Sequence, residues 1–261
     1  MNTNQAISDL HTNNFNTRNT ATLESQANSS SHPYKTEVNP YNQFTYQLKF
    51  KLKGKELLDS YRLRAKVFCN ELKWVGDDNT KFETDAFDKT SNHLGVISEH
   101  TGLVGTLRFT SHQHEWFMER YFSKLLPDNF NQLKVPTSVE ISRMAVENSI
   151  RACCMADGKK VVDLLYKGIY RYCHSRKITH AYIIISKSIF RHLRMHRMPI
   201  KLIGREVTMP DGVKTVAAEL DWNALYQSNN IKDQIFLEWL NDTTRSHNEL
   251  LWQQPASDSS H

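Results

Sequence analysis

Two kinds of hydrophobic spacing alternate along this chain, and their order limits the folds that it can adopt. Alternating apolar and polar residues over 44–52 predict a strand, whereas apolar residues at steps of three and four over 56–72 predict a helix. The continuous apolar run 181–185 is typical of a strand buried on both faces. Further strands are expected at 94–98, 103–110, 139–146, 200–207 and 213–220, and further helices at 115–126, 160–173, 188–196 and 231–240. This order predicts a single α/β (α+β) domain in which helices flank a mixed β-sheet.

The two ends of the chain differ in composition from this central part. Residues 1–43 are rich in Asn, Thr and Ser and contain few apolar residues, so they cannot bury enough surface to offset the entropy lost on ordering. We expect 1–43 to be a disordered tail that the fold does not need. We expect 44–245 to be the folded domain and 246–261 to be a flexible tail.

The composition of the chain bears on its cellular compartment and on its cysteines. Hydrophobic residues make up 39% of the 261 residues, but no apolar run reaches the roughly 18–20 residues that span a bilayer. The N-terminal residues lack the basic start and apolar stretch of a secretory signal, so we expect a cytoplasmic protein. No C-x-x-C pair is present, and we expect reduced thiols that mostly serve packing at Cys69, Cys153, Cys154 and Cys173.

Several charged residues interrupt the apolar patterns and are the first candidates for a site. Arg64 precedes Phe68 by four residues, so both lie on one face of the predicted helix. Arg108 lies within the strand 103–110, and Glu140 and Arg143 lie within the strand 139–146. Charged side chains inside strands are uncommon unless they are paired or functional.

The spacing of these residues leaves two questions open. Glu140 and Arg143 are three positions apart, so a regular strand places them on opposite faces, and only a β-bulge brings them together. They also have a simpler interpretation as a structural ion pair. Asp85 and Asp88 lie in a polar stretch, 75–91, that we expect to be a loop, and taken alone they read as solvated acids.

Taken in order, these residues resemble the acyl-homoserine-lactone synthases. The acidic stretch has the form E-x-D-x-x-D, the later strand contains E-x-S-R, and Met118 and Phe122 fit an M-x-x-x-F-x-x-L stretch. The resemblance covers about residues 45 to 225. It rests on eight residues in matching order: Arg64, Phe68, Trp74, Asp85, Asp88, Arg108, Glu140 and Arg143.

The resemblance implies a GNAT-like fold and a quorum-sensing acyltransferase. The acyl group would come from an acyl carrier protein, the acceptor would be the amine of S-adenosylmethionine, and lactonisation would release methylthioadenosine. S-adenosylmethionine would be a substrate, and no separate cofactor or metal is expected.

The same resemblance assigns roles to the residues. Glu140 would take the proton of the acceptor amine, directly or through a water. Arg108 and Arg143 complete the catalytic set by locking the acidic loop onto the sheet, and Arg64 would pair with Asp88 or with the acceptor carboxylate. Asp85 and Asp88 suit a cationic acceptor, and Phe68 and Trp74 would form its apolar walls. The acyl chain is expected to contact Met118, Phe122, Met144 and Ile183.

The expected donor side combines a missing glycine-rich loop with a basic stretch. Residues 151–158 contain a single glycine, unlike the loops that cradle the pyrophosphate of acetyl-CoA, and a carrier protein needs no such cradle. Acyl carrier proteins are acidic, so a basic helix is a plausible docking face, although a solvated helix face is equally compatible with its sequence. The expected docking residues are Lys187, Arg191, Arg194, Arg197 and Lys201.

Two other functions remain open. An N-acyl amino acid synthase, or the acyltransferase found beside exosortase systems, shares an R-x-x-x-F-C-x-E-L run that Arg64–Leu72 matches. A non-enzymatic nucleic-acid-binding protein has only the basic helix in its favour, because no aromatic stacking motif accompanies it. The spacing of Trp74 to Asp85 and the Met118 stretch favour the lactone synthase, and we expect no nucleic-acid partner.

Overall fold

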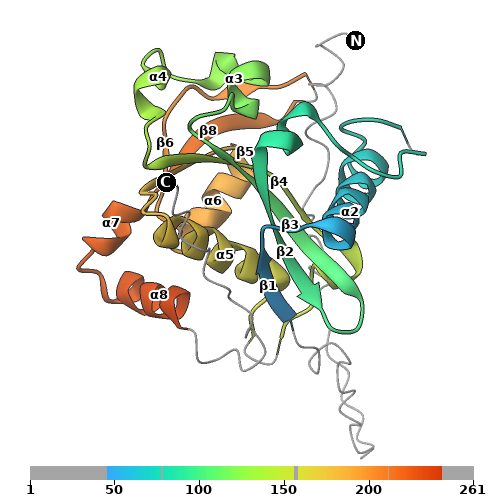
Figure 1. The fold of residues 1–261 in the computed structure, drawn as a ribbon. Helices are drawn as coiled ribbons and strands as arrows, with labels where there is room; N and C mark the ends of the chain where they lie inside the picture. The colour runs from blue at the N-terminus through green and yellow to red at the C-terminus, as the bar shows by residue number, and fades with distance from the viewer. Residues whose placement is uncertain (1–45, 78, 156–157, 211, 243–261) are drawn as a thin grey trace, which may run out of the picture.

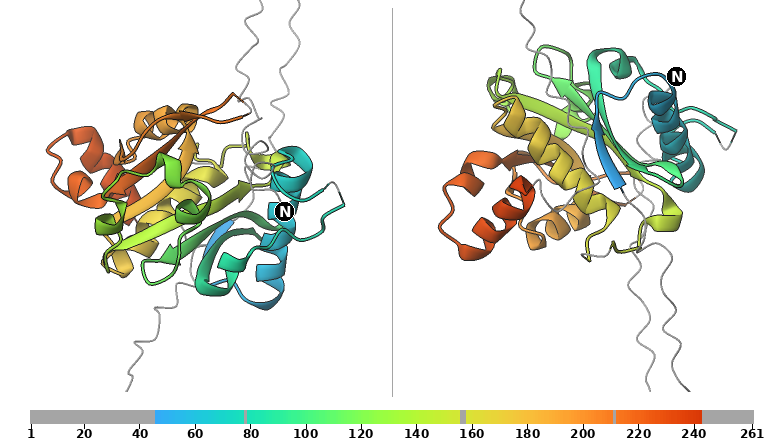
Figure 2. Two further views of the ribbon diagram at one scale, coloured as in Figure 1. Left: turned by 90° about the horizontal axis from the view of Figure 1, so that it is seen from above. Right: turned by 60° about the horizontal axis from the view of Figure 1, so that its bottom comes forward.

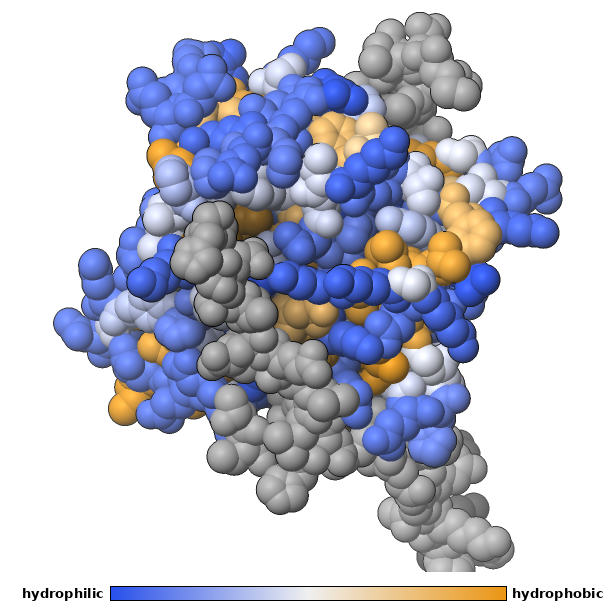
Figure 3. All heavy atoms as spheres, in the orientation of Figure 1, coloured by the Kyte–Doolittle hydropathy of each residue, from blue (hydrophilic) through white to orange (hydrophobic). Residues whose placement is uncertain are grey.

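The computed structural model describes residues 46–77, 79–155, 158–210 and 212–242. The two predicted tails, 1–43 and 246–261, lie outside the described residues. None of the helices in this described part combines the length and the hydrophobicity of a membrane span. Figure 3 shows a largely hydrophilic face on which hydrophobic side chains appear as small spots between polar ones.

One mixed sheet forms the centre of the molecule, as the alternation of patterns predicted (Figure 1). Its strand order is β1-β2-β3-β4-β5-β8-β6, and β7 pairs with β8. Every pairing is antiparallel except that of β4 with β5, which is parallel. The strands are β1 (Tyr46–Phe50), β2 (Ser91–Ser98), β3 (Gly102–Ser111), β4 (Ser138–Val146), β5 (His180–Ser186), β6 (Ile200–Leu202), β7 (Val207–Thr208) and β8 (Lys214–Asp221).

Helices cover both faces of this sheet (Figure 2). Successive side chains of a strand point to opposite faces, so each strand contributes to two layers of packing. One face packs against α5 (Val161–Ser175), α6 (Lys187–Met195), α7 (Trp222–Tyr226) and α8 (Ile231–Asn241). The other face packs against α2 (Gly54–Arg64), α3 (Phe117–Tyr121) and α4 (Phe130–Leu133).

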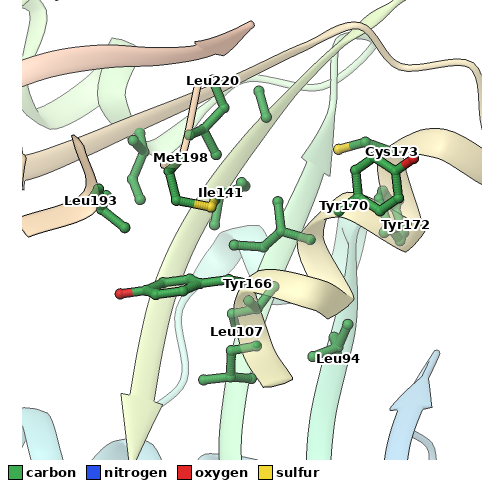
Figure 4. Close-up of a cluster of buried hydrophobic side chains, with 14 of the residues drawn as sticks. Leu94, Leu107, Ile141, Tyr166, Tyr170, Tyr172, Cys173, Leu193, Met198 and Leu220 are labelled. Carbon is green, nitrogen blue, oxygen red and sulfur yellow. The ribbon is translucent and has the colours of Figure 1, made fainter. Parts of the chain in front are cut away.

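The larger core lies between the sheet and α5. Figure 4 shows side chains of the strands, among them Leu94, Leu107 and Ile141, meeting those of α5, among them Tyr166. The helix approaches the sheet closely at Gly168, where an added Cβ would lie 2.7 Å from Leu94 Cδ1. Glycine allows this close contact, because a Cβ here would force the buried side chain of Leu94 or the helix to move.

Two predicted helices differ from those observed. The segment 56–72 is α-helical only to Arg64, and Ala65–Glu71 continue as a π-helix, with Leu72 N–H donating to the carbonyl of Val67. Hydrophobic steps of three and four do not distinguish one wide turn from an α-helix. The segment 115–126 is divided into α3 and a 3₁₀ turn, Ser123–Leu125, and the short α4 and α7 were not predicted.

The predicted strand 200–207 is also divided, into β6 and β7. Between them the chain meets the 3₁₀ turn, where Arg205 N–H donates to the carbonyl of Leu125 at 3.2 Å. A Cβ on Gly204 would lie 1.8 Å from that same carbonyl oxygen. The close approach of the two backbones explains the glycine and the interruption of the strand.

Two irregularities of β4 shape the surface on which the candidate site lies. β4 pairs with β5 only over Ser138–Glu140, opposite His180–Tyr182, and the two strands are unpaired beyond that point. On its other edge Ser142 pairs with Arg108 and Ala145 with Thr106, so β4 contains one extra residue. The residue in the bulge is Arg143, whose φ is +54°. β4 therefore has a bulge of the kind needed to bring Glu140 and Arg143 to one face, but the extra residue lies between Ser142 and Ala145 and the bulge includes Arg143 itself.

Candidate active site

Three arginines and three carboxylates form a buried cluster on the face of the sheet that α2 covers. Arg64, the last residue of α2, has a side chain that is only 1% exposed. Its Nη1 donates to Asp88 Oδ1 at 2.7 Å, and its Nη2 donates to Asp88 Oδ2 at 3.2 Å. Its Nε donates to Glu83. Burial opposes ionisation of Arg64, but the charge of Glu83 and the hydrogen bond of Asp88 outweigh it and raise its pKa.

Arg108 joins the same carboxylates from β3. Its Nη1 donates to Asp85 Oδ1 at 2.5 Å and to Asp88 Oδ1 at 2.9 Å, and its Nε donates to the hydroxyl of Ser142 at 3.0 Å. The side chain is fully buried. Arg108 therefore fixes the acidic segment to β3 and β4, as the resemblance implied.

Arg143 completes the cluster from the bulge of β4. Its Nη2 lies 3.0 Å from Glu83 Oε1 and 3.1 Å from Asp85 Oδ2. Its guanidinium carbon lies 4.5 Å from the ring centre of Phe117 and 5.7 Å from that of Phe68. These carboxylates and rings hold a side chain whose backbone is in the left-handed region, which non-glycine residues rarely adopt.

The acidic segment folds locally into a shape that presents its carboxylates. Asp85 caps a 3₁₀ helix, Ala86–Thr90, by accepting the N–H of Phe87 at 2.9 Å. Asp88 accepts the N–H of Asp85 at 2.8 Å in return. This reciprocal capping explains the spacing of the two aspartates.

The pKa of Asp88 reflects how completely its carboxylate is bonded. Burial alone would raise it, but the hydrogen bond and charge of Arg64 outweigh burial and lower the pKa to about 2. With Arg64, Arg108 and the Asp85 N–H as donors, Asp88 holds the site together. The role of Asp88 in binding the acceptor stays a prediction.

Glu140 lies beside the cluster, at the last position where β4 pairs with β5. Its Oε2 accepts the N–H of Phe117 at 2.8 Å, and its Oε1 accepts the N–H of Met118 at 2.7 Å. Burial raises the pKa of Glu140 to about 7, against the lowering effect of these two hydrogen bonds. Arg143 pairs with other carboxylates within the described residues, so the interpretation of Glu140 and Arg143 as an ion pair is wrong.

The predicted aromatic walls lie together at one side of the cluster. The rings of Phe68 and Trp74 are stacked, with centres 5.7 Å apart and planes inclined by 17°. The π-helix sets this arrangement, because Trp74 N–H donates to the carbonyl of Phe68 across its end at 2.7 Å. The pair forms a flat apolar surface next to Arg143.

The four residues expected to contact the acyl chain are divided between the two faces of the sheet. Met118 and Phe122 pack with the side chains of α3 and α4. Ile183 and Met144 pack instead on the α5 and α6 face. The set does not line a single pocket, because neighbouring strand residues alternate in direction and the bulge shifts that alternation at residue 143.

The five basic residues expected to dock the donor also divide into two groups. Lys187 pairs with Glu206, Arg197 lies 3.4 Å from Asp233, and Lys201 lies 2.9 Å from Asp221. Arg191 and Arg194 are exposed on α6 and form no ion pair with any described residue. These two guanidinium groups are the part of the basic stretch available to a partner.

One group of side chains has the spacing of metal ligands. Potential ligand atoms of His180, Glu219 and Asp221 lie within 4.8 Å of one another. The ammonium of Lys201 lies 2.9 Å from Asp221 and 3.5 Å from Glu219, so a protein cation already balances these carboxylates. The group has the character of an ion network between strands.

Sequence reasoning assigned no role to three residues of the site. Glu83 begins the E-x-D-x-x-D pattern, so its signal was present but was read only at the two aspartates. His93 is buried, its Nε2 lies 3.7 Å from Asp88 Oδ1, and burial lowers its pKa to about 4. Phe117 adjoins the predicted Met118, but no spacing rule in the sequence indicates that it contacts both Glu140 and Arg143.

Comparisons with known proteins agree with this geometry. The model of the autoinducer synthase family matches residues 49–228, more than half of the chain. An acyl-homoserine-lactone synthase of Aeromonas salmonicida is 25% identical over 148 residues, which cover 55% of this chain and 69% of that protein. A synthase of Vibrio anguillarum is 24% identical over 169 residues, 64% of this chain and 86% of that protein.

Solved structures share the fold. The CoA-dependent acyl-homoserine lactone synthase BjaI, solved with SAM and isopentyl-CoA, has a TM-score of 0.59 at 16% identity and covers 77% of this chain and 91% of its own. The N-acyl amino acid synthase FeeM has a TM-score of 0.52 at 13% identity, with 72% and 96% covered. The GNAT-like fold is thereby confirmed, and the family match decides against a non-enzymatic nucleic-acid-binding protein. The chain belongs to the autoinducer synthase family and is an acyltransferase of the acyl-homoserine-lactone synthase type.

Proposed function

We propose that this enzyme transfers an acyl group from an acyl carrier protein to the amine of S-adenosylmethionine. The amine attacks the thioester carbonyl, an amide bond forms, and the carrier leaves as a thiol. The carboxylate of this acylated intermediate then attacks the γ-carbon of the same molecule. The new carbon–oxygen bond closes the lactone, and the bond from the γ-carbon to sulfur breaks and releases methylthioadenosine. The observation that carries this proposal is Glu140, a buried carboxyl beside the arginine–carboxylate cluster, at the point where β4 and β5 separate.

In this proposal Glu140 is the general base. A base is most effective when its pKa lies near the working pH, and the pKa of about 7 meets that condition. Two backbone amides occupy one direction on each carboxylate oxygen, and each oxygen retains further acceptor capacity. The proton can therefore pass to Glu140 directly or through one water.

The acceptor would lie against the cluster and the stacked rings. Arg143 and Asp85, with side chains 9% and 18% exposed, are the more accessible charges of the cluster. A guanidinium suits the acceptor carboxylate, whereas Asp85 and the Phe68–Trp74 pair suit its ammonium and sulfonium. In this proposal Arg64 and Asp88 act indirectly, by holding the cluster in place.

The donor would enter where β4 and β5 are unpaired. Backbone groups freed from pairing beyond Glu140 and Tyr182 are available to meet the thioester oxygen, on which negative charge develops. On the α5 side of this opening the side chains are apolar, and Met144 and Ile183 belong to them. We assign the acyl chain to that side, in preference to Met118 and Phe122.

The choice of a carrier protein over CoA rests on charge and on sequence. Arg191 and Arg194 are exposed and unpaired among the described residues, so α6 offers positive charge to an acidic partner. The single glycine of 151–158 provides little to bind a pyrophosphate. We also propose that the enzyme acts in the cytoplasm, without a resident cofactor.

One assay separates the alternatives. The purified chain is incubated with S-adenosylmethionine and either octanoyl carrier protein or octanoyl-CoA, and mass spectrometry follows the lactone and methylthioadenosine. We expect both products with the carrier protein and a much lower rate with octanoyl-CoA. A higher rate with octanoyl-CoA refutes the choice of carrier, and acylated free amino acids without methylthioadenosine identify an N-acyl amino acid synthase.

A further inference from the structure

Phe117 contacts both Glu140 and Arg143. It is the first residue of α3, and its N–H donates to Glu140 Oε2 at 2.8 Å. Its ring centre lies 4.5 Å from the guanidinium carbon of Arg143. A single residue therefore touches the proposed base through its peptide group and the charge of the bulge through its ring.

Hydrogen bonds and aromatic neighbours hold the Phe117 ring in place. The next N–H of the chain, that of Met118, also donates to Glu140, so the first turn of α3 is attached to the carboxylate at two points. The ring packs edge-to-face on Phe87, with centres 5.5 Å apart, and lies 4.7 Å from the ring of Tyr121. The aromatic neighbours and the two hydrogen bonds restrain the ring where it faces Arg143.

The physical need for a separating group follows from the charges. Glu140 and Arg143 are opposite charges on one face of β4, in buried surroundings where attraction is weakly screened. Two other charged groups already act on the Glu140 carboxyl, since Arg108 lowers its pKa and Glu119 raises it. A direct ion pair between them would stabilise the ionised carboxylate and make it a poor proton acceptor near neutral pH. The N–H of Phe117 holds the carboxylate in place, although this hydrogen bond itself lowers the pKa of Glu140. The ring of Phe117 covers the guanidinium of Arg143, and this is the contact that opposes a direct ion pair.

We propose that Phe117 is a positioning residue that keeps Glu140 and Arg143 apart, so that Glu140 stays a base and Arg143 stays with Glu83 and Asp85. This inference rests on the proposed function, in which Glu140 accepts the proton of the acceptor amine. It extends that function by adding a residue that acts through its contacts with the base and with Arg143.

The test compares Phe117→Leu with the matched control Phe130→Leu. Phe130 is a buried aromatic residue whose ring packs on Trp116 and Tyr182 and, among the described residues, not on the guanidinium of Arg143. The pH dependence of kcat/KM for S-adenosylmethionine is measured through release of methylthioadenosine. We expect the acidic limb of Phe117→Leu to move down by about one pH unit. Its kcat should fall about tenfold. Phe130→Leu should lower the Tm and leave the limb where it is in the parent.

A second measurement does not depend on turnover. The carboxyl of Glu140 is titrated by NMR in protein labelled with ¹³C-glutamate, and Glu140→Gln identifies its resonance. A downward shift in Phe117→Leu supports the inference, and an unchanged titration overturns it. A shifted titration in an enzyme whose parent releases no methylthioadenosine refutes the proposed function alone. If Phe117→Leu does not fold, Phe117→Met is titrated in the same way.

Discussion

Glu140 and Arg143 lie on the same face of β4 because of one inserted residue, yet they bind different partners. Glu140 accepts two backbone N–H groups of α3, whereas Arg143 pairs with Glu83 and Asp85 of the acidic segment. The bulge turns Arg143 toward the site without pairing it to Glu140. The Glu140 carboxyl is therefore free to change its protonation state. The proposed chemistry depends on this separation.

Replacement of Glu140 by Gln tests the proposed base. We expect kcat to fall by about 10²–10⁴ when the base is removed. In the parent, kcat/KM should rise with pH through about 7, because the ionised form is the active one. Measurement of both parameters through methylthioadenosine release checks this prediction. Parental turnover in a folded Glu140→Gln protein would contradict it.

The same variant has a distinct effect on stability. The pKa of Glu140 in the folded state is raised from 4.5 to about 7, so the free energy of unfolding of the parent should decrease as pH rises from 4.5 to 7. The decrease should be about 3 kcal/mol. Glu140→Gln should lack this dependence, although it loses one of two backbone hydrogen bonds, at a cost of about 1–3 kcal/mol. Urea unfolding at several pH values measures the difference.

Replacement of Asp88 by Asn should destabilise the fold, because Asp88 is a buried partner of two arginines and not the solvated acid that its sequence context alone suggests. The change removes one charge from a buried cluster and leaves Arg64 and Arg108 with too few counter-charges, at a cost of about 3–5 kcal/mol. The pKa of Asp88 is lowered from 3.8 to about 2, so its contribution is present above pH 3.8 and is lost as pH falls toward 2.

The control for Asp88 is Asp59→Asn, which breaks an exposed pair with Arg62. Surface pairs contribute about 0–1 kcal/mol, so this control should unfold at nearly the urea concentration of the parent. Equal midpoints for Asp88→Asn and Asp59→Asn would show that the buried cluster does not need the charge of Asp88.

Much of this architecture is readable from the sequence, and the exceptions have physical causes. The bulge near Arg143 could be anticipated only on the condition that Glu140 and Arg143 act on one face, because residues three apart lie on opposite faces of a regular strand. The sequence did not indicate that the carboxylate of Asp88 is fully hydrogen-bonded. Its partners Arg64 and Arg108 are about twenty residues away, and a motif does not say which groups donate to which oxygen. The contacts of Phe117 could not be predicted from the sequence for the same reason, since they depend on where α3 meets β4.

Replacement of Gly204 by Ala should weaken the cover that α3 and α4 form over the sheet. Its Cβ would lie 1.8 Å from the carbonyl oxygen of Leu125, so the two backbones must move apart. We expect a loss of about 1–3 kcal/mol, typical of overpacking. Thermal unfolding measures it, with the exposed Arg205→Ala as control. An unchanged Tm for Gly204→Ala would show that this contact is not required.

Removal of residues 1–43 should leave the folded domain intact. Their composition gives them little apolar surface to bury, so they should contribute little to the free energy of unfolding. A chain that begins at residue 44 should unfold within a few degrees of the full chain and release methylthioadenosine at the same rate. A large drop in Tm would show that these residues pack on the domain.

Charge reversal on α6 tests the docking of the donor. Arg191→Glu with Arg194→Glu replaces two exposed cations that are unpaired among the described residues, so an acidic carrier protein should bind more weakly. We expect the KM for octanoyl carrier protein to rise about tenfold or more. A tenfold rise corresponds to a loss of about 1.4 kcal/mol in the free energy of binding. The KM for S-adenosylmethionine should not change, because the proposed acceptor site lies on the opposite face of the sheet. Lys124→Glu reverses an exposed charge next to α3 and serves as the control. If both reversals raise the KM for the carrier equally, net charge explains the effect, and α6 is not the docking face.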